Sequence, residues 1–196
     1  MTTTTATRPT APACIATSCP DVGIYVACLA AYNNGRLHGA WIDLEGDTDE
    51  DDLQEGIAWI LATSPEPGAE EWAMHDSCGL PSYLSRTESP DLSQLVAWAD
   101  ELSNYPEEDD REAYRLACED QGQTIDEDGF RETYCGLFKD GEDYAQELAE
   151  ELGSVPAGLA WPLNCIDWAS AWRDLTFDGY REEPCSGGWV HIFRPA

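Results

Sequence analysis

Carboxylates are the reactive side chains that this chain holds in greatest number. Thirty-nine Asp and Glu residues face ten Lys and Arg residues, so the formal net charge is −29. A general acid–base pair needs two carboxylates in distinct environments, whereas these acids occur in runs such as Asp49–Asp52 and Glu107–Asp110. His75 and Asp76 are adjacent, and neighbours in a strand point to opposite faces of the sheet. Because no nucleophile elbow, phosphate-binding loop or H-E-x-x-H motif is present either, we predict no enzymatic activity.

Metal binding is the second chemistry to consider. Asp47, Asp49 and Asp51 have the spacing that opens an EF-hand calcium loop, but the sixth position holds Asp52 instead of Gly and the twelfth holds Ala58 instead of Glu. The eight Cys residues form no C-x-x-C pair and have no His partner at zinc-like spacing. We therefore predict no metal and no cofactor.

The cysteines and the absence of targeting signals also predict a compartment. We find neither a signal peptide nor a run long enough for a transmembrane helix. The thiols are scattered along the chain, as expected for reduced and mostly buried cysteines. These features predict a cytoplasmic protein.

The charge restricts the partners that this chain can bind. Nucleic acids and anionic membranes are bound through Lys and Arg, so both would be repelled. A basic protein would be attracted. Since duplex DNA carries two phosphates per base pair, a charge of −29 corresponds to roughly 14–15 base pairs. The charge thus favours a mimic of DNA that occupies a basic groove, while adaptation to high salt is an alternative source of the same composition.

We predict that the mimic surface consists of the acidic runs. Part of each run has a simpler explanation, because acids stabilise the start of a helix through its dipole. That explanation does not account for the twelve acids, without a single Lys or Arg, between Arg36 and Arg86. The predicted surface comprises Asp43, Glu45, Asp47, Asp49, Glu50, Asp51, Asp52, Glu55, Glu107, Glu108, Asp109, Asp110, Asp126, Glu127, Asp128, Asp140, Asp143, Glu147, Glu150 and Glu151.

Local patterns predict the elements that would carry these acids. Residues 24–44 read as two strands around an Asn33–Gly35 turn, and Glu70–Cys78 as a third strand. Between them, Thr48 is the expected N-cap of a helix whose apolar stripe is Leu53, Ile57 and Ile60.

The remainder of the chain is predicted to be mostly helical. Ser89 and Pro90 would begin one helix, Pro106 the next, and Phe130 to Phe138 also show helical spacing. The segment 141–152 is an amphipathic helix with Tyr144, Leu148 and Leu152 on one face. A last helix, capped by Asn164, would direct Ile166, Trp168, Ala171, Trp172 and Leu175 to the core, and residues 179–194 would close the chain as a hairpin.

Together these elements predict an elongated α+β protein, with two small units of antiparallel sheet and helix flanking a helical middle domain. The expected boundaries are a disordered tail over 1–20, an N-terminal α+β domain over 21–82, a central helical domain over 83–123 and a C-terminal α+β domain over 124–196.

Three segments resemble the ArdA antirestriction proteins. IYVACLAAYNNGRLHGAWIDL (24–44) is similar to the family's opening strand, Tyr-Asn-x-Gly turn and Gly-x-Trp return. EEWAMHDSCGLP (70–81) resembles its aromatic-x-x-His-Asp strand, and VPAGLAWPLNCIDWASAWRDL (155–175) its Val-Pro-Ala and Arg-Asp-Leu run. The matches occur in the family's order, which makes them more specific than any one alone.

The resemblance implies an elongated, three-domain DNA mimic that dimerises and inhibits Type I restriction-modification enzymes at the DNA site of the methyltransferase core. The family's antirestriction motif, near its dimer interface, would fall around residues 151–167. The interface candidates are Val155, Pro156, Leu159 and Trp161. The alternatives are an acidic partner of another basic DNA-binding protein, such as a transcription factor or nucleoid protein, and a salt-adapted protein of other function.

Overall fold

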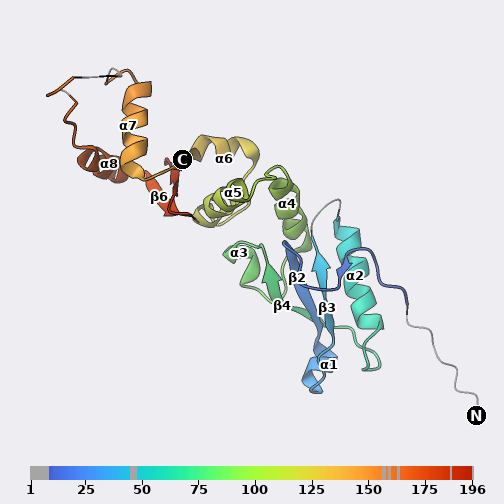
Figure 1. The fold of residues 1–196 in the computed structure, drawn as a ribbon. Coiled ribbons are helices and arrows are strands. Elements are labelled where there is room, and N and C mark those ends of the chain that lie inside the picture. The colour runs from blue at the N-terminus through green and yellow to red at the C-terminus, as the bar shows by residue number, and fades with distance from the viewer. Residues whose placement is uncertain are drawn as a thin grey trace, which may run out of the picture. The chain divides into compact units, whose positions relative to one another are not determined.

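The computed structural model describes residues 9–44, 48–155, 158, 160–162, 164–185 and 187–195. It confirms the predicted α+β class, with eight helices and two antiparallel sheets in those ranges (Figure 1). Along the chain, four successive helices separate the last strand of the first sheet from the first strand of the second. The elements are β1 (Ile15–Ala16), β2 (Gly23–Cys28), α1 (Leu29–Asn33), β3 (Gly39–Asp43), α2 (Glu50–Ala62), β4 (Trp72–Cys78), α3 (Ser82–Ser85), α4 (Leu92–Ser103), α5 (Glu108–Gln121), α6 (Glu127–Thr133), β5 (Tyr134–Phe138), α7 (Gly141–Glu151), α8 (Trp168–Phe177), β6 (Arg181–Pro184) and β7 (Val190–Phe193).

The chain divides into two compact units. The first contains residues 1–105 and 122–124, and the second contains residues 106–121 and 125–196. This division falls inside the segment predicted to be a central helical domain, since α4 belongs to the first unit and α5 to the second. The division into three domains and the elongated shape remain predictions.

The sheet of the first unit has the order β1-β3-β2-β4, and all neighbouring strands are antiparallel. Helix α2 packs against β2 and β3 (Figure 1). Its residues Leu53, Ile57 and Ile60 are buried, as their spacing predicted, because they share one face of the helix. Ile24 and Ile42 are fully buried on the sheet and complete this core.

The turn between β2 and β3 is longer than predicted. The short helix α1 follows β2, and the chain reverses after it with Gly35 at φ +73°, a conformation that favours glycine. The helix α2 begins one residue later than predicted, with Asp49 instead of Thr48 as its N-cap. Single-residue shifts of this kind arise because Thr and Asp are both good caps and tertiary contacts choose between them.

The predicted disordered tail differs from the structure over residues 9–20. Ile15 and Ala16 form β1, which pairs with Ile42 and Trp41 at the edge of the sheet. Cys14 is buried, and its thiol donates to the Asp52 carbonyl at 3.2 Å. The strand was not predicted because it has only two residues, which is too short to show an alternating pattern within a Thr- and Pro-rich segment. Residues 1–8 of the predicted tail lie outside the described residues.

A disulfide joins Cys19 to Cys78, so the prediction that the thiols are reduced is wrong for these two residues. Scattered cysteines do not reveal which pairs meet. Here the pairing of Gly23 with Cys78 across β2 and β4 brings the preceding segment close to Cys78. Cys14, Cys28 and Cys118 are in no disulfide and are buried, as predicted.

Helix α4 is anchored in the first unit by Trp98. This side chain is fully buried, and its indole N–H donates to the Gly79 carbonyl at 3.1 Å. The helix begins at Leu92 with Asp91 as N-cap, two residues after the predicted Ser89 cap. The next helix, α5, starts at Glu108 rather than at Pro106.

The sheet of the second unit has the order β5-β7-β6 and is antiparallel throughout. The predicted C-terminal hairpin is confirmed as β6 and β7. The helical spacing of Phe130 to Phe138 misled the prediction, because the segment changes from α6 to β5 at Tyr134. Tyr134 and Phe193 pair across β5 and β7, and Phe193 is buried in this core.

Helices α7 and α8 pack against each other. The last helix was predicted to bury one apolar face in a core, but α8 has no buried residue. The side chains concerned are each only partly covered: Ile166, Trp168, Ala171, Trp172 and Leu175. The N-cap of α8 is Asp167 rather than Asn164. No helix in the described part of the chain is long and apolar enough to cross a membrane.

Candidate functional site

Carboxylates crowd the start of helix α2 in the first unit. Asp49 Oδ1 accepts a hydrogen bond from the Asp52 amide at 2.9 Å, and Asp52 Oδ2 accepts one from the Asp49 amide at 3.2 Å. This reciprocal capping box satisfies backbone donors that the helix start leaves unpaired. Glu50, Asp51 and Glu55 are exposed and make no such cap. Local helix formation therefore accounts for two of these acids and leaves the others available to a partner.

Three of the predicted acids precede this helix in the sequence. Asp43 is half-exposed on β3. Glu45 and Asp47 lie outside the described residues.

The predicted acids of the second unit gather at three further helix starts. Glu107, Glu108 and Asp109 are exposed where α5 begins, and Asp110 is half-exposed. At the start of α6, Asp126 accepts from the Gly129 amide at 2.8 Å, and Glu127 and Asp128 follow it. At the start of α7, Asp140 accepts from the Asp143 amide at 2.9 Å, and Glu147, Glu150 and Glu151 continue along the exposed side. Every predicted acid that the structure describes is thus exposed or half-exposed.

Basic side chains neutralise only a small part of this surface. Arg131 pairs with Glu127 one helical turn away, and Lys139 Nζ lies 3.7 Å from Asp140 Oδ2. These side chains are largely exposed, and ion pairs of this kind contribute little to stability. Since ten basic residues face thirty-nine acids, most of the carboxylates keep an uncompensated charge.

The acids whose pKa is displaced perform structural roles. Hydrogen bonds from Ser93 lower the pKa of Asp91, and hydrogen bonds from Ser170 lower the pKa of Asp167. Both residues are helix N-caps. A general acid at neutral pH needs the opposite shift, so these two carboxyl groups are unsuited to that chemistry. In the described ranges, no group of three or more His, Cys, Asp or Glu residues is arranged to hold a metal ion.

Large apolar side chains are exposed in the second unit, and one of them belongs to the predicted dimer interface. Leu152 ends α7 with 71% of its surface exposed, and Phe177 ends α8 at 80%. Trp161 is a predicted interface residue and is 79% exposed, while Val155 is half-exposed. Pro156 and Leu159 lie outside the described residues. Exposed aromatic and aliphatic side chains of this size are typical of surfaces that bind another protein.

A buried histidine in the second unit was missed by the sequence argument. His191 is fully buried on β7, and its Nδ1 lies 3.1 Å from the Tyr134 hydroxyl. Its Nε2 has no hydrogen-bond partner among the residues that the structure describes, and it lies 3.9 Å from a Glu112 carboxylate oxygen. Burial lowers the pKa of His191, while Glu112, Asp109 and Asp110 oppose that shift. The ring is therefore neutral at pH 7, and it belongs to the core of this unit.

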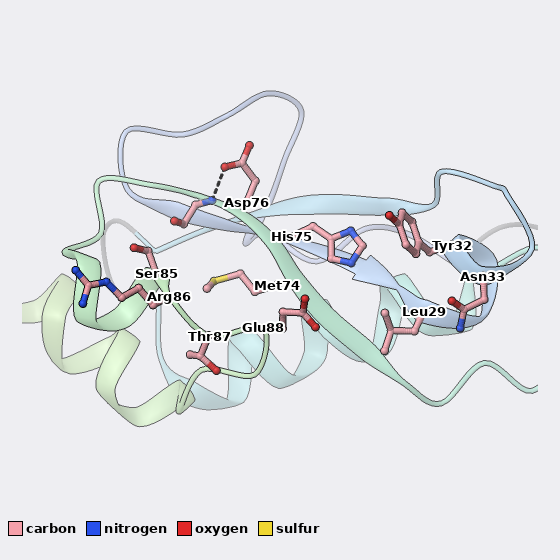
Figure 2. Close-up of a pocket in the computed structure, with 11 residues that line it drawn as sticks. Leu29, Tyr32, Asn33, Met74, His75, Asp76, Ser85, Arg86, Thr87 and Glu88 are labelled. Atoms are coloured by element: carbon pink, nitrogen blue, oxygen red, sulfur yellow. Dashed lines mark hydrogen bonds between the residues drawn. The ribbon is translucent and has the colours of Figure 1, made fainter.

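A polar pocket in the first unit also escaped the sequence argument. It has a volume of 670 Å³ and lies along β4, bordered by α1 and by the segment that follows α3 (Figure 2). Tyr32, His75, Asp76, Arg86 and Glu88 are among its lining residues. The sequence offered one sign of it, since the Tyr-Asn and His-Asp pairs lie in two of the segments that resemble ArdA. Their meeting depends on the pairing of β2 with β4.

Comparison with known families identifies the chain. A family model described as antirestriction protein (ArdA) matches residues 24–189. A search of curated proteins found no match. The match covers most of the chain, from Ile24 in β2 through β6, while β1 and β7 lie outside the matched range. ArdA proteins are non-enzymatic inhibitors, which confirms the prediction that this chain is not an enzyme. The chain therefore belongs to the ArdA family of antirestriction proteins.

Proposed function

We propose that this protein mimics B-form DNA and inhibits Type I restriction-modification enzymes by occupying the DNA groove of their methyltransferase core. The observation that carries the proposal is the display of the acidic runs. Each described member of the predicted surface is exposed or half-exposed, although several also cap a helix. A basic groove that normally neutralises phosphates would meet fixed carboxylates instead.

The spacing of the acids on helix α7 supports this mechanism. Asp143, Glu147 and Glu150 are three to four residues apart, so successive carboxylates rise about 5 Å along the helix axis. The phosphates of one DNA strand rise about 3.4 Å each. One helix therefore supplies a row of charge somewhat less dense than a single strand, and the other acidic helix starts would supply additional rows.

Competition with DNA tests this function directly. A purified Type I methyltransferase core with a labelled duplex would be titrated with this protein at two salt concentrations. We expect displacement near stoichiometric protein, weaker at the higher salt, because charged pairing is screened. No displacement at low salt would refute the proposal. Capture of a different basic DNA-binding protein from a lysate would then identify that protein as the target.

We further propose that the protein acts as a homodimer in the cytoplasm, where restriction enzymes meet incoming DNA. The exposed Trp161 and the half-exposed Val155 support an interface in the second unit. Trp161→Ala should shift the mass measured by light scattering toward that of a monomer. Leu37→Ala is the matched control, because Leu37 is 92% exposed in the first unit and lies outside the proposed interface. An unchanged mass in Trp161→Ala would argue against this interface.

A further inference from the structure

The pocket along β4 is shaped by an irregularity in the strand. β2 pairs with β4 so that Tyr25 lies opposite Asp76 and Val26 opposite Met74, which leaves His75 as an extra residue on β4. Such a bulge interrupts the alternation of side chains and redirects them. Strict alternation predicts that His75 and Asp76 face opposite sides, yet both are exposed and both line this pocket.

The wall opposite β4 is held in place by the backbone. The Met74 amide donates to the Glu88 carbonyl at 2.7 Å, which fixes the segment after α3 alongside the strand. Arg86 lies at one end of the pocket, and its guanidinium points away from the other lining residues (Figure 2). Glu88, His75 and Tyr32 all lie toward the other end (Figure 2). The pocket thus has one end that combines a carboxylate with aromatic rings.

That end contains polar groups without internal partners. Within the described residues, the side chains of Asn33 and Glu88 and the hydroxyl of Tyr32 make no hydrogen bond or ion pair. The Tyr32 and His75 rings pack edge to face with their centroids 4.8 Å apart. Tyr32 still has 53% of its surface exposed. An open aromatic surface in the same pocket as an unpaired carboxylate matches a flat cation that donates hydrogen bonds.

We propose that this pocket receives an arginine side chain of a basic protein partner, with the guanidinium stacked on Tyr32 and paired with the Glu88 carboxylate. Arginine fits better than lysine because its planar head stacks on rings, carries five donors and is weakly hydrated. An anionic ligand such as a nucleotide is disfavoured by Asp76 and Glu88 and by the net charge of −29. This inference builds on the proposed function, since it names a discrete contact within an otherwise distributed interface.

The pocket can be tested without the restriction enzyme. The full-length ¹⁵N-labelled protein would be titrated with N-acetyl-arginine N-methylamide and followed through the Asn33 side-chain amide and the backbone amides of 75–77 and 86–88. We expect saturable shifts at these positions with a dissociation constant on the order of 1–10 mM, as suits a single side chain. The lysine analogue should bind at least threefold more weakly, and adenosine monophosphate should leave the pocket signals unchanged.

Two variants separate the pocket from general charge. Glu88→Gln should weaken arginine binding about tenfold, as expected for the loss of a charge-assisted pair. Glu70→Gln removes the same charge from an exposed site outside the pocket and should leave binding unchanged. Equal binding of the arginine and lysine analogues, equal effects of the two variants, or shifts with adenosine monophosphate instead would each overturn the proposal.

The same variants in the DNA competition assay connect the pocket to the target. At elevated salt, where distributed charge is screened, Glu88→Gln should displace DNA several-fold less effectively than Glu70→Gln. Equal displacement by the two variants would refute a role for the pocket in binding the enzyme while leaving DNA mimicry intact. If the unaltered protein fails to displace DNA but still binds the arginine analogue, the proposed function fails and the arginine specificity of the pocket stands.

Discussion

At Gly141, the first residue of α7, helix propensity favours replacement by alanine while packing against Trp172 opposes it. Glycine is unfavourable in helices, and replacing it with alanine ordinarily gains up to about 1 kcal/mol. Here the ring of Trp172 on α8 lies over the glycine, so that a Cβ would come within 3.0 Å of several indole atoms. Real Cβ atoms do not approach so closely, and either Trp172 must leave or the two helices must separate.

We expect Gly141→Ala to lower the free energy of unfolding of the second unit by about 1–2 kcal/mol. This figure is the usual cost of overpacking, roughly 1–3 kcal/mol, reduced by the gain in helix propensity. Trp172 is only half-covered, which gives it a route to solvent and keeps the loss toward the lower part of the range. The Gly141 amide also donates to Glu182 Oε2 at 2.9 Å, so a shift of the helix start would disturb this bond to β6.

A double-mutant cycle isolates the contact. Urea unfolding would be followed by circular dichroism for the unaltered protein, Gly141→Ala, Trp172→Ala and the double variant. In the Trp172→Ala background the ring is absent, so Gly141→Ala should become neutral or stabilising by up to about 1 kcal/mol. The coupling energy should therefore be roughly 2 kcal/mol. Stabilisation by Gly141→Ala in the unaltered protein, or the same effect in both backgrounds, would refute the packing of α8 on α7 described above.

Four further predictions concern stability and binding. Because burial lowers the pKa of His191, the unfolded chain takes up a proton near pH 6.5 before the folded chain does. The stability that this group contributes is therefore present above pH 6.5 and is lost below it, by at most about 1.4 kcal/mol per pH unit. Urea unfolding measured across this pH range should show that His191→Gln loses less stability on acidification than the unaltered protein. Equal losses in the two proteins would contradict the buried, neutral state of His191. The Cys19–Cys78 disulfide joins residues 59 positions apart in the chain, so Cys19→Ser should lower the free energy of unfolding of the first unit by up to about 4 kcal/mol. An unchanged midpoint in thermal or urea unfolding would argue against the bond. Added salt should raise the melting temperature of the free protein because it screens the repulsion within a surface of −29, and a fall between low and moderate salt would oppose this reasoning. Single changes such as Glu50→Gln in the predicted mimic surface should each weaken DNA displacement by about 1 kcal/mol or less, while a loss above about 3 kcal/mol would indicate a discrete site in place of a distributed one.

Residue patterns alone were sufficient for the class of fold and for much of the secondary structure. The stripe of Leu53, Ile57 and Ile60 predicted the buried face of α2, because a helix brings residues three to four apart onto one side. The run of acids predicted an exposed surface because burying many unpaired carboxylates is prohibitive. Neither inference needs knowledge of which segments meet.

Patterns failed where a pairing partner decides the conformation. Phe130 to Phe138 have helical spacing, yet residues from Tyr134 onward form β5 because β7 supplies hydrogen bonds that no local signal announces. Residues 15–16 pair with β3 despite a composition typical of a loop. Context overrides local preference in both cases, since a strand is completed by a neighbour distant in the chain.

The sequence by itself determined that this protein carries a large negative charge on amphipathic helices and that its segments match the ArdA family, because composition and periodicity are properties of the chain. Only the tertiary structure decided that Tyr32, His75 and Glu88 share a pocket, that His191 is buried beside Glu112, and that the apolar face of α8 remains partly uncovered. These features depend on strand register and on packing between distant segments, which arise from many weak contacts acting together and which no local pattern in the sequence specifies.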